Sequence, residues 1–332
     1  MTIKFKAVNA LEQDGKLNID INDLNITDLY SGDVLIKVLY STINYKDGLA
    51  LNYNKGKIMR KFPIIPGIDF SGIVLESDHQ KFLPGDEVIA TGWGLGETHT
   101  GGLSQMARVN GDWLIKKPTG ISLKDSMVLG TAGLTSMLSI LEFENNNITP
   151  QHGPVLVTGG SGGVGSISIS LLSNLGYEVI ALTRSVENFD YLNSLGASQV
   201  IYTNNLNNEG KFLNKGQWSA VIDTVGGDIL SSLIPSIKNK GCVALCGNVS
   251  GVNLNTNVLP FILRGIRLIG IDSNNCSFET RSIAWERLSE KINILKSNLI
   301  ITKIGLVDVF KIAEEILLGN IKGRILVDVN LI

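Results

Sequence analysis

Cysteine is scarce in this sequence, which holds only Cys242, Cys246 and Cys276. Three cysteines cannot form a paired disulfide framework. Cys242 and Cys246 stand at the two ends of an apolar run that predicts a buried strand. We therefore expect these two thiols in the core and expect no contribution from disulfides to the stability of the fold.

An excess of basic charge and a long apolar run are also missing. The chain carries 29 Lys and Arg against 31 Asp and Glu residues, a net charge of −2, so no positive field attracts nucleic acid. No stretch approaches the uninterrupted apolar length of a membrane span. Residues 1–8 alternate charged and apolar side chains, as a first strand does, and lack the apolar core of a signal peptide. These observations predict a cytoplasmic protein with neither a nucleic-acid nor a membrane partner.

The most informative segment present is a glycine-rich turn at residues 159–165. A short apolar strand over 155–158 precedes it, and a helical stretch over 166–175 follows it. Gly160, Gly162 and Gly165 fit the spacing G-x-G-x-x-G, in which glycine permits a tight turn and lets backbone N–H groups approach a pyrophosphate. The strand, turn and helix together predict a dinucleotide site.

The residues that end the next strand, expected over 178–182, indicate which dinucleotide is bound. An acidic side chain there would hold the ribose of NAD, whereas this chain has Thr183, Arg184 and Ser185. A guanidinium and two hydroxyls suit a 2′-phosphate, so we expect NADPH as the cofactor. The alternative is that Arg184 is a solvated surface residue and that Glu187 binds the ribose of NAD.

Apolar and helical segments alternate after the turn and predict a doubly wound, six-stranded parallel sheet of the Rossmann type in an α/β fold. The strands are expected over 155–158, 178–182, 199–202, 219–223, 241–246 and 267–272, with helices over 187–195, 228–238 and 258–264. The first 125 residues are instead rich in short alternating strands and Pro/Gly turns, which indicates an irregular antiparallel β domain. Helices near 279–296 and 308–318 and a last strand over 324–329 must then return to this first domain, leaving a cleft between the two.

Seven ordered segments resemble the medium-chain dehydrogenase/reductase superfamily over essentially the whole chain. They are 44–47, 62–70, 91–97, 130–133, the glycine turn, 222–226 and 260–264. The chain is most similar to the zinc-free quinone-oxidoreductase-like branch, and within it to the NADPH-dependent acrylyl-CoA reductases. The resemblance implies a GroES-like catalytic domain over 1–125 and 274–332, a Rossmann NADP-binding domain over 126–273, and a homodimer joined through sheet edges.

The zinc ligands of related alcohol dehydrogenases are absent. Those enzymes have a Cys where this chain has Asn44, a His-Glu pair where it has Ile68-Asp69, and a four-Cys lobe in place of the 91–102 loop. A catalytic zinc needs convergent Cys, His or carboxylate ligands. We therefore expect hydride transfer from NADPH to an activated alkene without a metal.

The same resemblance implies roles for individual residues. It gives Tyr45, Asn44 and Asp47 as the catalytic group at the nicotinamide end, although a turn Asn and a packed Tyr remain the alternative. It implies cofactor contacts at Tyr45, Thr131, Ser161, Gly162, Gly163, Val164, Thr183, Arg184, Ser185, Thr203, Asn248, Ile262, Ser273 and Arg324. Ser185 and Thr203 depart from the family, because close relatives have arginine at both positions.

The predicted activity is the reduction of acryloyl-CoA, an enoyl thioester, to propanoyl-CoA. Two alternatives remain open: a general NADPH:quinone or enone reductase, and a non-enzymic NADPH-binding structural or regulatory protein. The phosphates of coenzyme A require cations, for which Lys46, Arg60 and Arg264 are candidates by position and charge. Trp93 either flanks the acyl group or fills the domain junction, and His99 is a possible substrate contact.

Overall fold

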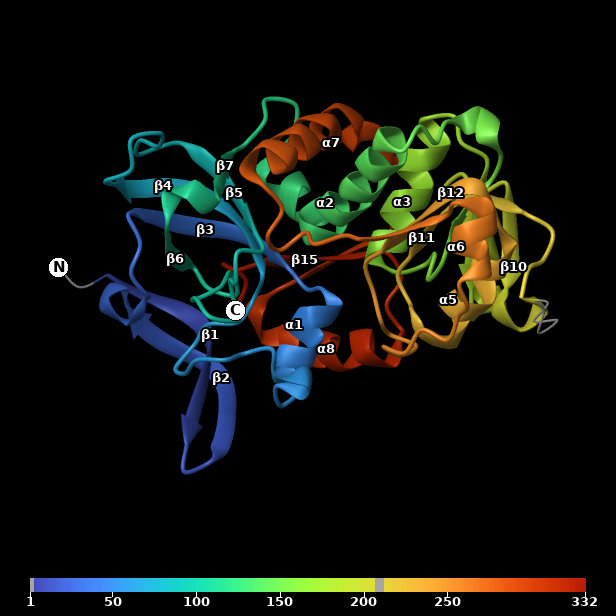
Figure 1. Ribbon diagram of the computed structural model, residues 1–332. Coiled ribbons are helices and arrows are strands. Elements are labelled where there is room, and N and C mark those ends of the chain that lie inside the picture. Colours follow the sequence, from blue (N-terminus) through green and yellow to red (C-terminus); the bar gives the residue numbers. More distant parts are fainter. Residues whose placement is uncertain (1–2, 207–211) are drawn as a thin grey trace. The chain divides into compact units, whose positions relative to one another are not determined.

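The computed structural model describes residues 3–206 and 212–332, which divide into two compact units (Figure 1). Unit 1 comprises Met1–Thr131, Asn274–Ile292 and Ile300–Ile332. Unit 2 comprises Ala132–Ser273 and Asn293–Leu299. The chain thus passes from one unit to the other after Thr131, Ser273, Ile292 and Leu299.

A six-stranded parallel sheet forms the centre of unit 2. Its strands are β8 (Val155–Val157), β9 (Val179–Thr183), β10 (Gln199–Tyr202), β11 (Trp218–Asp223), β12 (Ile237–Leu245) and β13 (Arg267–Gly270). They lie in the order β10-β9-β8-β11-β12-β13, so the direction of winding reverses between β8 and β11. This confirms the doubly wound sheet, in which ligands bind at the carboxyl ends of the strands beside that reversal.

Short helices connect these strands. They are α3 (Gly163–Asn174), α4 (Phe189–Ser194), α5 (Gly227–Leu233) and α6 (Leu259–Arg264). The helix expected over 228–238 is wrong at its end, because α5 stops at Leu233 and a 3₁₀ turn leads into β12 at Ile237. Pro235 has no N–H to continue an α-helix, and it restricts the residue before it.

Helix α2 (Leu123–Asn145) carries the chain from unit 1 into unit 2 and is interrupted at Gly130, where φ is 52° and ψ is −151°. By length and composition alone it meets the criteria for a membrane span, although Ser, Thr and Gly residues interrupt its apolar run. However, 83% of its apolar window is buried, as in the core helix of a globular domain. Length and composition alone are therefore weak evidence for a span.

Unit 1 contains a largely antiparallel sheet of seven strands. These are β3 (Val34–Thr42), β4 (Asp69–Ser77), β5 (Glu87–Thr91), β6 (Met106–Val109), β7 (Leu114–Lys116), β14 (Ile301–Ile304) and β15 (Arg324–Asp328). The expected return of the C-terminal segment is confirmed, because β15 pairs antiparallel with β3. Helices α1 (Tyr45–Leu51) and α8 (Val309–Leu318) pack on each other, and α7 (Phe278–Asn298) runs from unit 1 into unit 2.

A long hairpin of β1 (Lys4–Gln13) and β2 (Lys16–Asn25) completes unit 1 (dark blue in Figure 1). Its turn residues Asp14 and Gly15 both have positive φ, 52° and 71°, as a two-residue hairpin turn requires. The sequence analysis anticipated only the first of these strands. The Asp-Gly pair between alternating apolar residues was the signal for the second.

Candidate active site

Helix α1 positions the tyrosine at its first turn through a cap built from Asn44 and Asp47. The Asn44 backbone N–H donates to Asp47 Oδ2 over 2.8 Å, and its side-chain Nδ2 donates to the same oxygen over 3.2 Å. The second Asp47 oxygen accepts from the N–H of Ile68 over 2.9 Å. Tyr45 is half-buried, and among the residues described here its hydroxyl has no hydrogen-bond partner.

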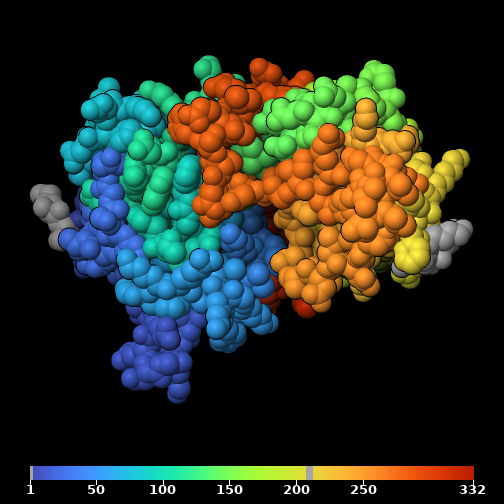
Figure 2. Space-filling model, in the orientation of Figure 1, coloured from blue at the N-terminus to red at the C-terminus, as the bar shows by residue number. Residues whose placement is uncertain are grey.

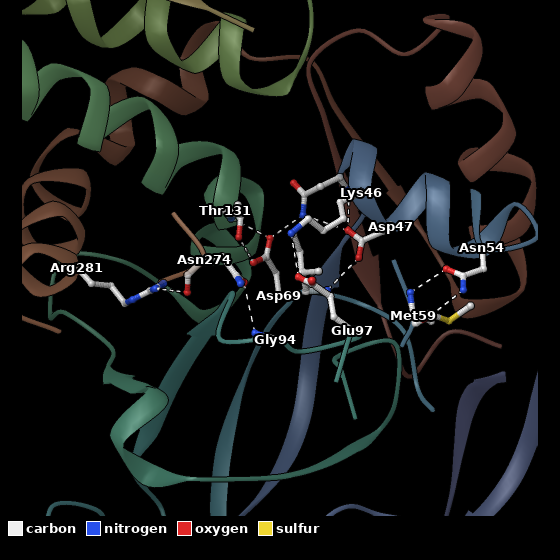
Figure 3. A network of polar contacts seen from close by, with 12 residues as sticks. Lys46, Asp47, Asn54, Met59, Asp69, Gly94, Glu97, Thr131, Asn274 and Arg281 are labelled. Atoms are coloured by element: carbon white, nitrogen blue, oxygen red, sulfur yellow. Dashed lines mark hydrogen bonds and ion pairs between the residues drawn. The ribbon is translucent and has the colours of Figure 1, made fainter. Parts of the chain in front are cut away.

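The carboxylate of Asp69 lies beside this cap at the start of β4 (Figure 3). Asn44 Nδ2 donates to Asp69 Oδ2 over 2.8 Å, as does the backbone N–H of Thr131, and the Thr131 hydroxyl donates to Asp69 Oδ1. This arrangement depends on Gly130, where a Cβ would lie 2.7 Å from Asp69 Oδ2 and 2.8 Å from Thr42 Cγ2. Its backbone angles are also ones that only glycine adopts readily.

Arg324, at the start of β15, supplies the positive charge of this network. Its Nη1 donates to Asn44 Oδ1 over 3.3 Å, its Nη2 to Thr42 Oγ1 over 2.8 Å and its Nε to the Val128 carbonyl over 2.8 Å. The side-chain amide of Asn44 is therefore oriented, with its oxygen towards the cation and its nitrogen towards both carboxylates. The resemblance implied a cofactor contact at Arg324; here its guanidinium nitrogens bind groups of unit 1.

Burial dominates the electrostatics of this network. Asp47, Asp69 and Arg324 are 1%, 0% and 3% exposed. Burial, reinforced by the nearby charge of Asp69, raises the pKa of Asp47 to about 7. Burial also raises the pKa of Asp69, although hydrogen bonds from Thr131 and Asn44 and the charge of Arg324 oppose that rise. The pKa of Arg324 falls to about 10 because its guanidinium is desolvated.

An ion pair connects α1 to the 91–102 loop. Lys46 Nζ lies 2.9 Å from Glu97 Oε1, and the Glu97 side chain is only 8% exposed. The Glu97 backbone carbonyl accepts from the N–H of Arg60 over 2.8 Å. Lys46, a candidate cation for the substrate's phosphates, is thus already paired with a nearly buried carboxylate.

Trp93 belongs to the same loop and is held within unit 1. Its ring lies 4.8 Å from the Arg281 guanidinium, and its backbone N–H donates to the Asn274 carbonyl over 3.1 Å. The buried Arg281 side chain donates through Nη1 to the carbonyl of Thr91 over 2.6 Å. Loop residues 91–94 are therefore fastened to Asn274, where the chain re-enters unit 1 (Figure 3).

The glycine turn in unit 2 has the shape that a pyrophosphate needs. A Cβ on Gly165 would lie 2.3 Å from the Gly159 carbonyl oxygen, so α3 can approach β8 this closely only with glycine. A Cβ on Gly162 would meet one atom within 4 Å, at 3.4 Å, so this side of the turn has room. Gly162 caps α3, whose first N–H groups have no intrahelical partners and suit an anion.

The end of β9 lies next to this turn. Asn188 is 6% exposed and connects the two segments, because its Nδ2 donates to Ser161 Oγ over 3.0 Å and to Thr183 Oγ1 over 3.4 Å. Arg184 is exposed and, within residues 3–206 and 212–332, has no ion pair. A free guanidinium beside the phosphate turn fits a 2′-phosphate. The sequence analysis missed Asn188.

The remaining expected cofactor residues also belong to unit 2. Thr203 follows β10 and donates to the Thr183 carbonyl over 2.9 Å. Asn248 is exposed after β12, Ser273 ends the first stretch of unit 2, and Ile262 lies on α6 with 71% of its surface exposed. Gly163 and Val164 lie in the first turn of α3, and Ser185 precedes a 3₁₀ turn.

His99 and Arg264, both considered as substrate contacts from the sequence, are held by other parts of the protein. His99 is 9% exposed, its Nε2 lies 3.0 Å from the Ser31 carbonyl, and its ring packs against Tyr30 and Trp113. Arg264 donates to the carbonyls of Pro235, Ile237 and Asn214. No group of three or more His, Cys, Asp or Glu residues in the described part of the chain is arranged to hold a metal ion.

Comparisons with known proteins agree with this arrangement. The Alcohol dehydrogenase GroES-like domain family matches residues 30–119, and the Zinc-binding dehydrogenase family matches residues 163–290. Acrylyl-CoA reductase AcuI of Ruegeria pomeroyi is 43% identical over 97% of this chain and 98% of its own length. Putative quinone oxidoreductase YhfP of Bacillus subtilis is 43% identical over 98% of this chain and 99% of its own.

Solved structures are similar over the same length. Escherichia coli K-12 YhdH with bound NADPH has a TM-score of 0.93 at 43% identity, covering 98% of this chain and 100% of the other. Bacillus subtilis yhfP with NAD bound has a TM-score of 0.93 at 42% identity, with the same coverage. The two crystallised neighbours thus hold nicotinamide dinucleotides that differ in the 2′-phosphate.

Proposed function

Because the chain belongs to the medium-chain dehydrogenase/reductase superfamily, we propose that it is an NADPH-dependent acrylyl-CoA reductase. It reduces the C2–C3 double bond of acryloyl-CoA and releases propanoyl-CoA. The observation that carries the proposal is the near full-length similarity, at 43% identity, to acrylyl-CoA reductase AcuI of Ruegeria pomeroyi. The cofactor is supported by the NADPH-bound E. coli neighbour and by the free guanidinium of Arg184.

The Rossmann domain, 126–273, holds the cofactor, and the GroES-like domain, 1–125 and 274–332, carries the catalytic group. Backbone N–H groups of the turn at Ser161–Val164 bind the pyrophosphate, because the open side of Gly162 gives them access. Arg184 binds the 2′-phosphate, helped by the hydroxyls of Thr183 and Ser185. Thr203, Asn248, Ile262 and Ser273 line the rest of the nucleotide.

Thr131 supports the nicotinamide carboxamide through an oriented hydroxyl. The Thr131 hydroxyl donates its proton to Asp69, and a hydroxyl oriented in this way presents its oxygen as an acceptor, here towards the carboxamide NH₂. Asp69 thereby acts through Thr131 as a positioning residue. When bound, NADPH would supply a hydride to the β-carbon of the thioester, and the resulting enolate would take up a proton at the α-carbon.

Tyr45 contacts the reacting groups, while Asn44 and Asp47 set its place. Its hydroxyl is unengaged among the described residues and can donate to the thioester oxygen as that oxygen gains negative charge. The Asn44–Asp47 cap fixes the first turn of α1, and Arg324 fixes Asn44. These buried partners hold the backbone of Tyr45 in place. The Tyr45 hydroxyl therefore stays aligned with the thioester oxygen.

A general quinone reductase is the second candidate, favoured by the 43% identity to YhfP. Steady-state NADPH oxidation with acryloyl-CoA, crotonyl-CoA and benzoquinone separates the two activities. The highest kcat/KM is expected with acryloyl-CoA. A far higher value with benzoquinone would overturn the choice, and background rates with all three, despite tight NADPH binding, would favour a structural or regulatory protein.

The proposed assembly is a cytoplasmic homodimer formed through the sheet edges of unit 2. Strand β13 is the last strand in that sheet, so one of its edges is unpaired within the described chain. Ile262, Leu263 and Val258 nearby in sequence are 71%, 62% and 64% exposed. Strand β13 itself carries Leu268 and Ile269, and an apolar edge strand of this kind is suited to pair with a second copy.

A further inference from the structure

The segment Tyr53–Lys61, which follows α1 directly, carries a group of unpaired cations. Lys55, Lys57, Arg60 and Lys61 are all exposed, and no acidic residue lies between positions 48 and 68. Within the described part of the chain none of the four forms an ion pair. Lys61 Nζ only lies over the Tyr30 ring, 3.9 Å from its centroid. Four cations without counter-ions favour an anionic ligand.

The backbone of this segment is held in a conformation that costs free energy. Tyr53, Asn54 and Lys57 have φ of 51°, 52° and 53°, in the left-handed region that non-glycine residues seldom occupy. Asn54 stabilises the loop, because its Nδ2 donates to the Met59 carbonyl and its Oδ1 accepts from the Met59 N–H, both over 2.8 Å (Figure 3). The four cationic side chains therefore extend from a loop whose backbone conformation is fixed by these hydrogen bonds.

Apolar side chains anchor the same loop from below. Met59 is 2% exposed and Ile64 is 1% exposed, and they form a cluster with Ala10 and Ala50. The segment, light blue in Figure 2, lies at the surface of unit 1 above the dark blue hairpin. The apolar side of the segment is thus packed in the core, and its charged side chains remain at the surface.

An aromatic ring stands at the beginning of the segment. Tyr53 is 82% exposed, the highest value among the large apolar and aromatic side chains of the described residues. A freely accessible ring beside cations is the combination that binds a purine and its phosphates, because the base stacks while the cations neutralise charge.

The segment is also continuous with the candidate active site. Arg60 N–H donates to the Glu97 carbonyl, and the Glu97 side chain binds Lys46, the residue after Tyr45. Lys46 is paired with Glu97, and Arg264 donates to backbone carbonyls such as that of Pro235. Of the three cations considered from the sequence for the phosphates of coenzyme A, Arg60 therefore remains. In coenzyme A, the pantetheine arm separates the thioester from a nucleotide that carries a diphosphate and a 3′-phosphate.

We propose that the segment Tyr53–Lys61 binds the 3′-phosphorylated adenine nucleotide of the coenzyme A substrate, an inference that rests on the proposed function. Lys55, Lys57, Arg60 and Lys61 bind its phosphates, and Tyr53 stacks on its adenine. The thioester end then extends towards Tyr45 at the other end of α1.

The test compares acryloyl-CoA with acryloyl-pantetheine, which lacks the nucleotide. In the variant K55A/K57N, asparagine preserves the left-handed backbone at position 57 while the charge is lost. The KM for acryloyl-CoA should rise about tenfold, as expected for two exposed phosphate contacts. The KM values for acryloyl-pantetheine and for NADPH should stay unchanged.

Matched variants complete the experiment. K4A/K124A removes the same charge from exposed lysines elsewhere in unit 1 and should change no KM. Tyr53→Asn should raise the KM for acryloyl-CoA, whereas Tyr53→Phe should not. Equal effects on both thioesters, an effect on NADPH instead, or no effect would overturn the assignment.

A binding measurement separates this site from the chemistry. Calorimetry with adenosine 3′,5′-bisphosphate should detect binding to the wild-type protein and much weaker binding to K55A/K57N. If neither thioester is reduced but this difference persists, the proposed function fails and the nucleotide site stands. If both thioesters are reduced and the ligand binds both proteins equally, only the nucleotide site fails.

Discussion

Thr131 donates two hydrogen bonds to the carboxylate of Asp69, one from its backbone N–H and one from its hydroxyl. The contact joins the last residue of the first stretch of unit 1 to the start of β4. It exists because the chain turns at Gly130, where α2 is interrupted. The orientation of the Thr131 hydroxyl, and hence its proposed use towards the carboxamide, depends on that single glycine.

Gly130→Ala should therefore destabilise the protein by about 3 kcal/mol, because strain at positive φ adds to a clash with Asp69 and Thr42. Urea unfolding measures the loss. Gly265→Ala is the control, since Gly265 has φ of 59° but no atom within 4 Å of the added Cβ. It should cost about 1 kcal/mol, and equal losses in the two variants would contradict the clash at Gly130.

Asp69→Asn should destabilise the protein by about 3 kcal/mol, because it leaves the buried Arg324 charge with less compensation and replaces one of the two carboxylate oxygens that accept hydrogen bonds with an NH₂ donor. The double variant Asp69→Asn with Arg324→Gln should lose less than the sum of the two single losses. Denaturant unfolding of the four proteins gives this coupling. Strictly additive losses would show that the two charges do not interact.

Asp47 should make the stability depend on pH between about 4 and 7. Its pKa is about 7 in the folded protein against an ordinary value of 3.8, so the folded state holds the proton more tightly than the unfolded state. The stability of the wild type relative to Asp47→Asn should fall as pH rises from 5 to 7, by about 1.4 kcal/mol per pH unit, and then level off. Unfolding curves at pH 5, 6, 7 and 8 test this. A constant difference would show that the pKa of Asp47 is not raised.

Arg184→Ala should raise the KM for NADPH at least about tenfold while changing that for NADH little, because only NADPH carries the 2′-phosphate that a guanidinium can bind in two places. Arg184→Lys keeps the positive charge but loses the planar guanidinium that can donate two parallel hydrogen bonds. Its KM for NADPH should therefore lie between those of the wild type and Arg184→Ala. Steady-state kinetics with both cofactors make the comparison. Similar effects on NADPH and NADH would remove this contact.

Much of unit 2 was predictable from sequence because local signals and global fold agree there. Gly160, Gly162 and Gly165 predicted both the turn and the helix that follows it, and β10 lies over the expected residues. Helix α5 ends early because Pro235 outweighs the apolar pattern around it. The length and composition of α2 also fit a membrane span, and only its tertiary packing shows that the helix is buried in the core.

The candidate site was predicted less completely because its key contacts join distant segments. Asp69 entered only as a position where zinc enzymes differ, yet it binds Asn44 and Thr131, which lie 25 and 62 positions away. Arg324 meets the same network from the opposite end of the chain. The sequence alone does not reveal which residues of β3 and β15 are paired, nor that α2 is interrupted at Gly130. Both features are needed to bring these residues together.

Transfer of hydride from NADPH to the β-carbon of the enoyl thioester is the centre of this account. The direct measurement incubates the enzyme with acryloyl-CoA and NADPH carrying deuterium at both C4 positions, and then locates the label in the product by mass spectrometry and NMR. The account predicts propanoyl-CoA with one deuterium at the β-carbon. Unlabelled propanoyl-CoA, label at the α-carbon, or no reduced thioester while benzoquinone is reduced rapidly would contradict it.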